Sequence, residues 1–125
     1  MRRILLLAAI SGFLTIAIGA FAAHALRAVL DVQQLGWIDT GVRAQGWHTL
    51  VLLAVAILVA LRPSRLLHAA AAAFVLGIVF FSGGLYGLAL AGHGTLAVLI
   101  PVGGVCLLAG WLLLIVYAVR LPRGG

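Results

Sequence analysis

The run from Ile4 to Ala23 constrains this chain more than any other feature, because it holds no charged residue and follows directly after Arg2 and Arg3. A helix of about 20 residues is about 30 Å long, which matches the hydrocarbon core of a lipid bilayer. The run is also longer than the apolar part of a secretory signal peptide, which is about 7–15 residues. It therefore predicts a membrane-spanning helix over residues 4–23.

The rest of the chain has the same character, since 66% of its 125 residues are hydrophobic and only 8% are charged. Soluble domains have about 45–50% apolar residues, and one domain of this length could not bury such an excess. Three more apolar runs predict helices over about 41–61, 66–91 and 101–119, separated by turns at Pro63 and around His93. We predict an all-α membrane protein whose four transmembrane helices form a compact bundle, with one domain over residues 1–125.

Residues 24–40 form the only stretch of mixed polarity, and they lie between the first two predicted spans. Apolar residues recur there at helical spacing, with charged and amide side chains on another face. The pattern predicts a short amphipathic helix over about 25–35, which lies in the membrane interface and ends at Gly36. Asp39 or Thr40 is then expected to cap the second span.

All eight basic residues are arginine, and the net charge is +6 because the only acids are Asp31 and Asp39. The arginines lie at the ends of the apolar runs rather than in one patch, so we expect no nucleic-acid partner. One side of the predicted bundle holds most of them, at Arg2, Arg3, Arg62, Arg65, Arg120 and Arg123. Because arginine-rich loops stay on the cytoplasmic side of a membrane, both termini are predicted to be cytoplasmic.

Small residues recur along the predicted helices at spacings that place them on shared faces. The positions expected to pack helix against helix are Ser11, Thr15, Gly19, Ala23, Gly83, Gly87, Gly103 and Gly104. Small side chains let neighbouring backbones approach closely, which is how helices associate in lipid. Two interpretations stay open, since these seams can join helices of one chain or form an interface with a second copy or another membrane protein.

No Asp, Glu, Lys or Arg lies in the middle of a predicted span. Pumps and proton-coupled transporters usually need such a group to bind an ion within the membrane, so a transporter formed by one chain is disfavoured. The sequence also has no GxSxG motif, and Cys106 is its only cysteine, which excludes an intrachain disulfide and a CxxC site. We therefore expect no enzymatic activity, no metal site and, in the favoured interpretation, no cofactor.

The remaining polar side chains gather toward the side of the bundle away from the termini. Counting along the helices predicts a layer that joins the first three spans and consists of His24, Gln45, His48, Ser82 and Tyr86. In one interpretation these side chains bond one another and hold the bundle together. In the other they line a ligand pocket, where paired histidines bind haem iron or another metal, or a His/Tyr pair binds a quinone.

Several short strings, taken in order, resemble a known family. They are residues 19–26 (GAFAAHAL), Trp37 with 40–42 (TGV), 47–48 (WH), 81–86 (FSGGLY), and 100–104 (IPVGG) with 110–111 (GW). Together they resemble the small bacterial membrane-protein family of YgdD and YwdK, which also has a vertebrate transmembrane relative. The resemblance implies a bacterial inner-membrane protein with four spans. It implies no activity, because the family carries a domain of unknown function.

The chain departs from the family pattern in three places. One is the segment before the second histidine, where the family is rich in aromatic residues and this chain has RAQGW at residues 43–47. Ala22 stands where the family has glycine, and Ile100 stands where the family has threonine before the proline. The resemblance directs attention to the polar and proline positions that match the family strings, which are His24, His48, Ser82, Tyr86 and Pro101.

The favoured interpretation is an integral inner-membrane protein with a structural or accessory role, in contact with the lipid bilayer and with a larger membrane complex or further copies of itself. The alternative is a cofactor- or ligand-binding module that uses the polar layer. A small oligomeric channel or transporter is a third interpretation, disfavoured because no charged residue lies in the middle of a predicted span.

Overall fold

The chain folds into four long helical segments, each long and apolar enough to cross a membrane. The computed structural model describes residues 1–92 and 94–124. Its elements are α1 (Arg2–His24), the 3-10 turn η1 (Leu26–Ala28), α2 (Val32–Leu61), α3 (Arg65–Gly77), the π-helical segment η2 (Ile78–Ser82), α4 (Gly83–Ala91), α5 (Gly94–Ala97) and α6 (Leu99–Arg120). The predicted all-α membrane protein with four transmembrane helices is confirmed.

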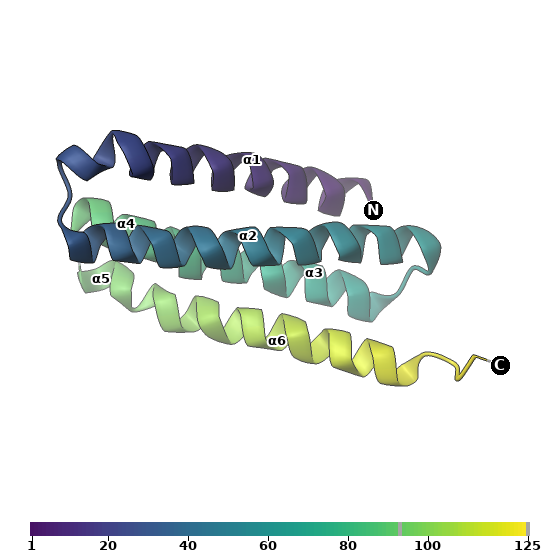
Figure 1. The fold of residues 1–125 in the computed structure, drawn as a ribbon. Helices are drawn as coiled ribbons and strands as arrows, with labels where there is room; N and C mark the ends of the chain where they lie inside the picture. The colour runs from purple at the N-terminus through teal and green to yellow at the C-terminus, as the bar shows by residue number, and fades with distance from the viewer. Residues whose placement is uncertain (93, 125) are drawn as a thin grey trace.

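The helices lie side by side in the order of the chain (Figure 1). Helix α1 packs along α2, and α6 packs along α3 and η2. The segments α3, η2 and α4 follow one another directly, and all three contact α2. Helices α1 and α6 therefore lie on either side of a central pair, which consists of α2 and the continuous α3–η2–α4 segment. Both termini lie at the same end of the molecule (Figure 1).

The predicted amphipathic helix over 25–35 is not a separate element. Only the single turn η1 forms after α1, and the chain from Val32 onward belongs to α2. The reason is a capping box at Asp31, whose Oδ1 accepts a hydrogen bond from the Gln34 backbone N–H at 2.8 Å. The Gln34 side-chain oxygen accepts one in return from the Asp31 N–H at 3.0 Å, so α2 starts here.

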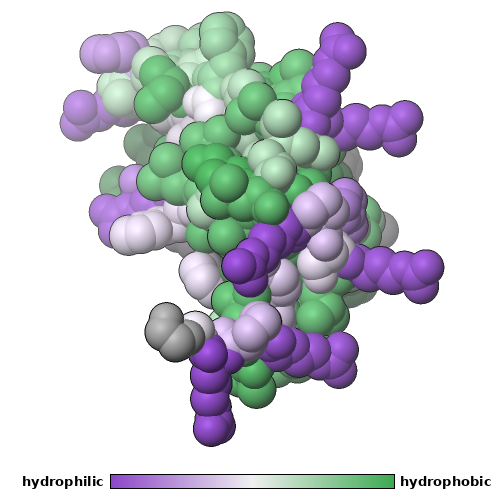
Figure 2. Space-filling view, turned by 90° about the vertical axis from the view of Figure 1, so that its right-hand side faces the viewer, coloured by the Kyte–Doolittle hydropathy of each residue, from purple (hydrophilic) through white to green (hydrophobic). Residues whose placement is uncertain are grey.

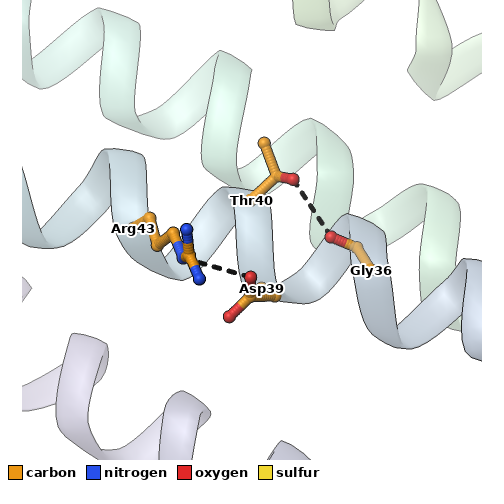
Figure 3. A network of polar contacts seen from close by, with 4 residues as sticks. All are labelled: Gly36, Asp39, Thr40 and Arg43. Atoms are coloured by element: carbon orange, nitrogen blue, oxygen red, sulfur yellow. Dashed lines mark hydrogen bonds and ion pairs between the residues drawn. The ribbon is translucent and has the colours of Figure 1, made fainter.

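The predicted cap at Asp39 or Thr40 is also wrong, because both residues lie inside α2. Asp39 instead pairs with Arg43 one turn later, and the Thr40 hydroxyl donates to the Gly36 carbonyl at 3.1 Å (Figure 3). Gly36 does not end a helix, since one glycine costs an exposed helix only about 1 kcal/mol. The fully buried Ile38 fixes this extension of α2 against the rest of the fold.

The main apolar core lies where α2, α3 and α6 meet. Phe74 and Leu67 are fully buried there, and Leu52 and Leu107 pack into the same cluster. The Phe74 ring fits because Gly110 has no side chain, as a Cβ at that position would lie 2.6 Å from Phe74 Cε1. A second, smaller cluster at the opposite end joins η1, α2 and α4.

At η2, the α3–η2–α4 segment packs very closely against α6. A Cβ on Gly103 would lie 2.7 Å from the Cα of Phe81, so the two backbones touch with no side chain between them. Short π-helical turns add a residue to a helix and occur where a helix must adapt to a neighbour or a site. No feature of the sequence predicted this π-helical segment.

Most of the predicted packing residues serve contacts within the chain. Thr15 lies on Gly46, Gly19 on Val42 and Gly87 on Leu96. Gly104 makes only an ordinary contact with Phe81, and a side chain at Gly83 would meet nothing. Thr15, Gly19 and Gly87 thus pack within the chain, whereas Ala23 and Gly83 are exposed.

The end of the molecule that carries both termini is ringed by hydrophilic side chains around an apolar centre (Figure 2). Arg2 and Arg3 open α1 at this end, and the turn between α2 and α3 adds Arg62 and Arg65. The end of α6 contributes Arg120. The fold thus collects most of the positive charge at one end, as the arginine count predicted.

Candidate functional site

The candidate site is a buried polar layer where α1, α2 and α4 meet. We define it by the side chains that form one hydrogen-bonded chain, namely Ser11, Thr15, Gln45, Thr49 and Tyr86. The α1–α2 contact brings Ser11 and Gln45 together, and the α2–α4 contact adds Tyr86. The layer thus links three helices through side chains.

Gln45 is the centre of this layer. Its Nε2 donates to the Ser11 backbone carbonyl at 3.1 Å and to Ser11 Oγ at 3.2 Å. Its Oε1 accepts a hydrogen bond of 2.7 Å from the Tyr86 hydroxyl. Only 4% of Gln45 is exposed, and both polar atoms of its amide form hydrogen bonds inside the protein.

Three hydroxyl residues complete the layer, Ser11 and Thr15 on α1 and Thr49 on α2. Ser11 Oγ and Thr49 Oγ1 are 2.7 Å apart and share a hydrogen bond. The Thr15 hydroxyl donates to the Ser11 carbonyl at 2.8 Å. The Ser11 backbone carbonyl therefore accepts hydrogen bonds from the side chains of both Gln45 and Thr15.

Ser82 makes a separate bond next to the layer. Its hydroxyl donates to the Gly41 carbonyl at 2.7 Å, and the residue is only 1% exposed. Gly41 also makes room for Tyr86, because a Cβ there would lie 2.7 Å from the tyrosine ring. Together these contacts bring α4 onto α2 at the level of Gln45.

His48 does not join the layer, although it lies three residues after Gln45. It faces α3 and α6, with its ring 5.7 Å from the Phe74 ring and 6.1 Å from the Trp111 ring, measured between centroids. Three residues turn a helix by about 300°, which places the two side chains about 60° apart. Here that angle is enough to give them different neighbours.

Both ring nitrogens of His48 have partners. Nε2 accepts a hydrogen bond of 3.1 Å from the Trp111 indole N–H, so Nε2 carries no proton. Nδ1 lies 2.6 Å from the Ala44 carbonyl and is then the protonated donor. The geometry assigns a neutral imidazole, and a metal could bind it only after the bond from Trp111 breaks.

His24 lies exposed at the end of α1, on the flank of the fold opposite α6. His48 faces α6, so the structure does not place these two histidines on either side of one ligand. His93, which we interpreted as a turn residue, lies outside the described residues. Within residues 1–92 and 94–124 there is also no cluster of three or more metal-binding side chains.

A cavity of about 160 Å³ borders the layer on the side of α3. Ser11 and Gln45 are its polar lining residues, and the rest of the lining is aliphatic. In the described part of the chain, no buried side-chain nitrogen or oxygen lacks a hydrogen-bond partner. The arrangement can therefore hold helices together, because its polar atoms are already engaged.

Sequence reasoning identified part of this layer and missed another part. Gln45 and Tyr86 are in contact and Ser82 lies beside them, as expected. Ser11 and Thr15 were interpreted as packing residues only, and their hydroxyls prove to be hydrogen-bonding members of the layer. Their signal was a pair of hydroxyl residues four apart in an otherwise apolar run.

Comparison with known proteins decides the family of this chain. The family described as "Protein of unknown function (DUF423)" matches residues 18–104. The UPF0382 inner membrane protein YgdD of Escherichia coli K12 is 45% identical over 124 residues, which covers 99% of this chain and 95% of that protein. The chain belongs to the DUF423 family.

Other DUF423 family relatives show the same near-complete coverage. A UPF0382 membrane protein of Haemophilus influenzae is 44% identical over 86% of both chains. The UPF0382 membrane protein YwdK of Bacillus subtilis is 34% identical over 96% of this chain and 98% of its own length. No solved structure matches the chain. The resemblance predicted from the sequence strings is therefore confirmed.

Proposed function

We propose that this DUF423 family protein is a structural or accessory subunit of the bacterial inner membrane, with no catalytic centre of its own. The observation that carries the proposal is the closed polar layer. The buried polar residues Ser11, Gln45, Thr49 and Ser82 all bond within the chain. A substrate in this region would have to displace one of these hydrogen bonds. A structural role requires no such change, because the bonds already link the helices.

The outer helices supply surfaces for a membrane partner. Helix α1 contacts α2 along one side, and only Ile4, Ala8 and Ser11 of its residues are buried. Phe13 and Ile16 are each 74% exposed on its other sides. An exposed apolar helix face in lipid can associate with another transmembrane helix by close packing. We expect the partner to dock on α1.

The orientation of the chain is part of the proposal. Both termini lie at the end that holds Arg62 and Arg65, and positive loops stay in the cytoplasm. We infer that both termini are cytoplasmic. The names of relatives such as the Escherichia coli inner membrane protein support the same membrane.

The experiment is a crosslinked purification in native lipid particles, with every recovered polypeptide quantified. We expect one other membrane protein in stoichiometric amount. The double substitution Phe13→Ala with Ile16→Ala should reduce that amount several-fold. The matched control, Val105→Ala with Leu108→Ala, alters equally exposed side chains on α6 and should leave it unchanged. Recovery of the chain alone, or only with copies of itself, would contradict the proposal.

A further inference from the structure

A cavity of about 290 Å³ lies between α1 and α2 at the end of the molecule away from the termini. One wall is made of small residues of α1, Gly19, Ala22 and Ala23. Arg27 from the η1 turn and Asp39 from α2 line the same cavity. A small apolar wall thus meets one positive and one negative side chain.

The two charges have different surroundings. Asp39 Oδ2 is 3.1 Å from Arg43 Nε, which reaches back along α2 (Figure 3). Both side chains of this pair are well exposed, so the pair contributes little to stability. Among the described residues, none forms an ion pair with Arg27. The guanidinium of Arg27 and the Oδ1 atom of Asp39 are therefore available to a ligand.

The cavity lies at the depth of lipid headgroups. The uncharged run of α1 ends at Ala23, and Arg27 follows one turn later. Asp39 stands two residues before Gly41, where the apolar part of α2 was predicted to begin. Charged residues at such a boundary meet the phosphates of the bilayer surface.

The geometry points to a bound phospholipid with a phosphoethanolamine headgroup, its phosphate on Arg27 and its primary ammonium on Asp39. Arginine donates paired hydrogen bonds to phosphate oxygens, and a carboxylate accepts hydrogen bonds from an ammonium group. The glycerol backbone then lies on the wall formed by Ala22 and Ala23, and the acyl chains extend from the cavity into the bilayer.

The ammonium contact sets the specificity of the site. Phosphatidylcholine carries a trimethylated ammonium with no N–H to donate to Asp39. Phosphatidylglycerol carries the phosphate for Arg27 but no cation for Asp39. The order of retention is therefore expected to be phosphatidylethanolamine first, with the other two below it. This inference does not rest on the proposed accessory function, because it uses neither the polar layer nor the α1 face at Phe13 and Ile16.

The test uses the full chain in lipid nanodiscs that contain equal amounts of these three lipids with identical acyl chains. Native mass spectrometry then counts the lipid that stays bound after the disc is removed. For the unaltered chain we expect phosphatidylethanolamine to exceed phosphatidylcholine about fivefold, a ratio typical of one exposed charge-assisted contact. Asp39→Asn should lower that ratio toward one, because the neutral amide oxygen accepts a weaker hydrogen bond from the ammonium N–H than a carboxylate does.

Substitutions of Arg27 test the phosphate contact. Arg27→Gln should lower the retention of all three lipids, and Arg27→Lys should restore part of it. Arg65→Gln removes an arginine at the opposite end and should change nothing. Thermal unfolding of each variant checks that it is folded. Equal retention of the three lipids by the unaltered chain would overturn the proposal, as would an unchanged preference in folded Asp39→Asn.

Discussion

The amide of Gln45 reaches two helices at once, so its substitution is expected to have a large effect on stability. Gln45→Leu removes its bonds to Ser11 and Tyr86 and leaves the Tyr86 hydroxyl without the amide oxygen to which it donates. We expect the free energy of unfolding to fall by about 1–3 kcal/mol. Reversible unfolding in detergent or lipid discs measures this loss.

The matched control is Thr40→Val, which removes an exposed hydroxyl that bonds only within its own helix. Its effect should stay within about 0.5 kcal/mol. An equal effect of the two substitutions would show that the layer contributes nothing beyond an ordinary surface bond.

Tyr86 and Gln45 should act as one unit. Tyr86→Phe removes the hydroxyl that donates to Gln45 Oε1 and keeps the ring that rests on Gly41. In a double-mutant cycle with Gln45→Leu, we expect a coupling energy of about 0.6 kcal/mol and no more than about 1.7 kcal/mol, the average and the maximum found for hydrogen bonds between membrane helices. Strictly additive effects would mean that the bond of 2.7 Å does not form in the membrane.

The limits of prediction at this scale follow from helix geometry. Gln45 and Tyr86 could be foreseen because polar side chains in an apolar span must find partners, and few partners exist. His48 could not be placed, since a rotation of about 60° around α2 separates it from Gln45. The depth of a residue in a span can be counted along the sequence, but its direction depends on which helix packs on which face.

At the scale of the helices, Gly103 controls how closely α6 approaches η2. In Gly103→Ala the new methyl group would lie 2.7 Å from the Cα of Phe81, and backbone atoms cannot turn aside. The two segments must move apart, so we expect the free energy of unfolding to fall by ~1–3 kcal/mol. The unfolding experiment used for Gln45 measures it.

The neighbouring position provides the control. In Gly104→Ala the methyl group would lie 3.9 Å from the Phe81 ring, which is an ordinary contact. Alanine also favours the helix over glycine by up to ~1 kcal/mol. Gly104→Ala should therefore be neutral or stabilising. If both substitutions behave alike, the close packing of η2 against α6 is not present.

The helices themselves were largely predictable, and their ends were less so. Long apolar runs identify four spans because the bilayer fixes the length of a helix. The start of α2 differs from the prediction because the capping pair Asp31 and Gln34 begins the helix inside the stretch of mixed polarity. The η2 segment could not be predicted, since it lies where Gly103 of α6 packs directly against the backbone of Phe81.

At the scale of the whole molecule, the orientation in the membrane can be tested with single cysteines. In a Cys106→Ser background, Arg123→Cys and Gly94→Cys place thiols at opposite ends of the bundle. We expect a membrane-impermeant maleimide added to intact cells to label the thiol at position 94 and not the one at 123. The reverse pattern would contradict the cytoplasmic placement of the termini.

The central claim is that the polar layer joins helices and holds no ligand. Native mass spectrometry of the chain, purified in mild detergent, tests this claim most directly. We predict that the only retained masses are phospholipids and any partner polypeptide, and that Gln45→Leu leaves the retained set unchanged. A retained non-lipid cofactor that disappears in folded Gln45→Leu would contradict the claim and identify the layer as a ligand site.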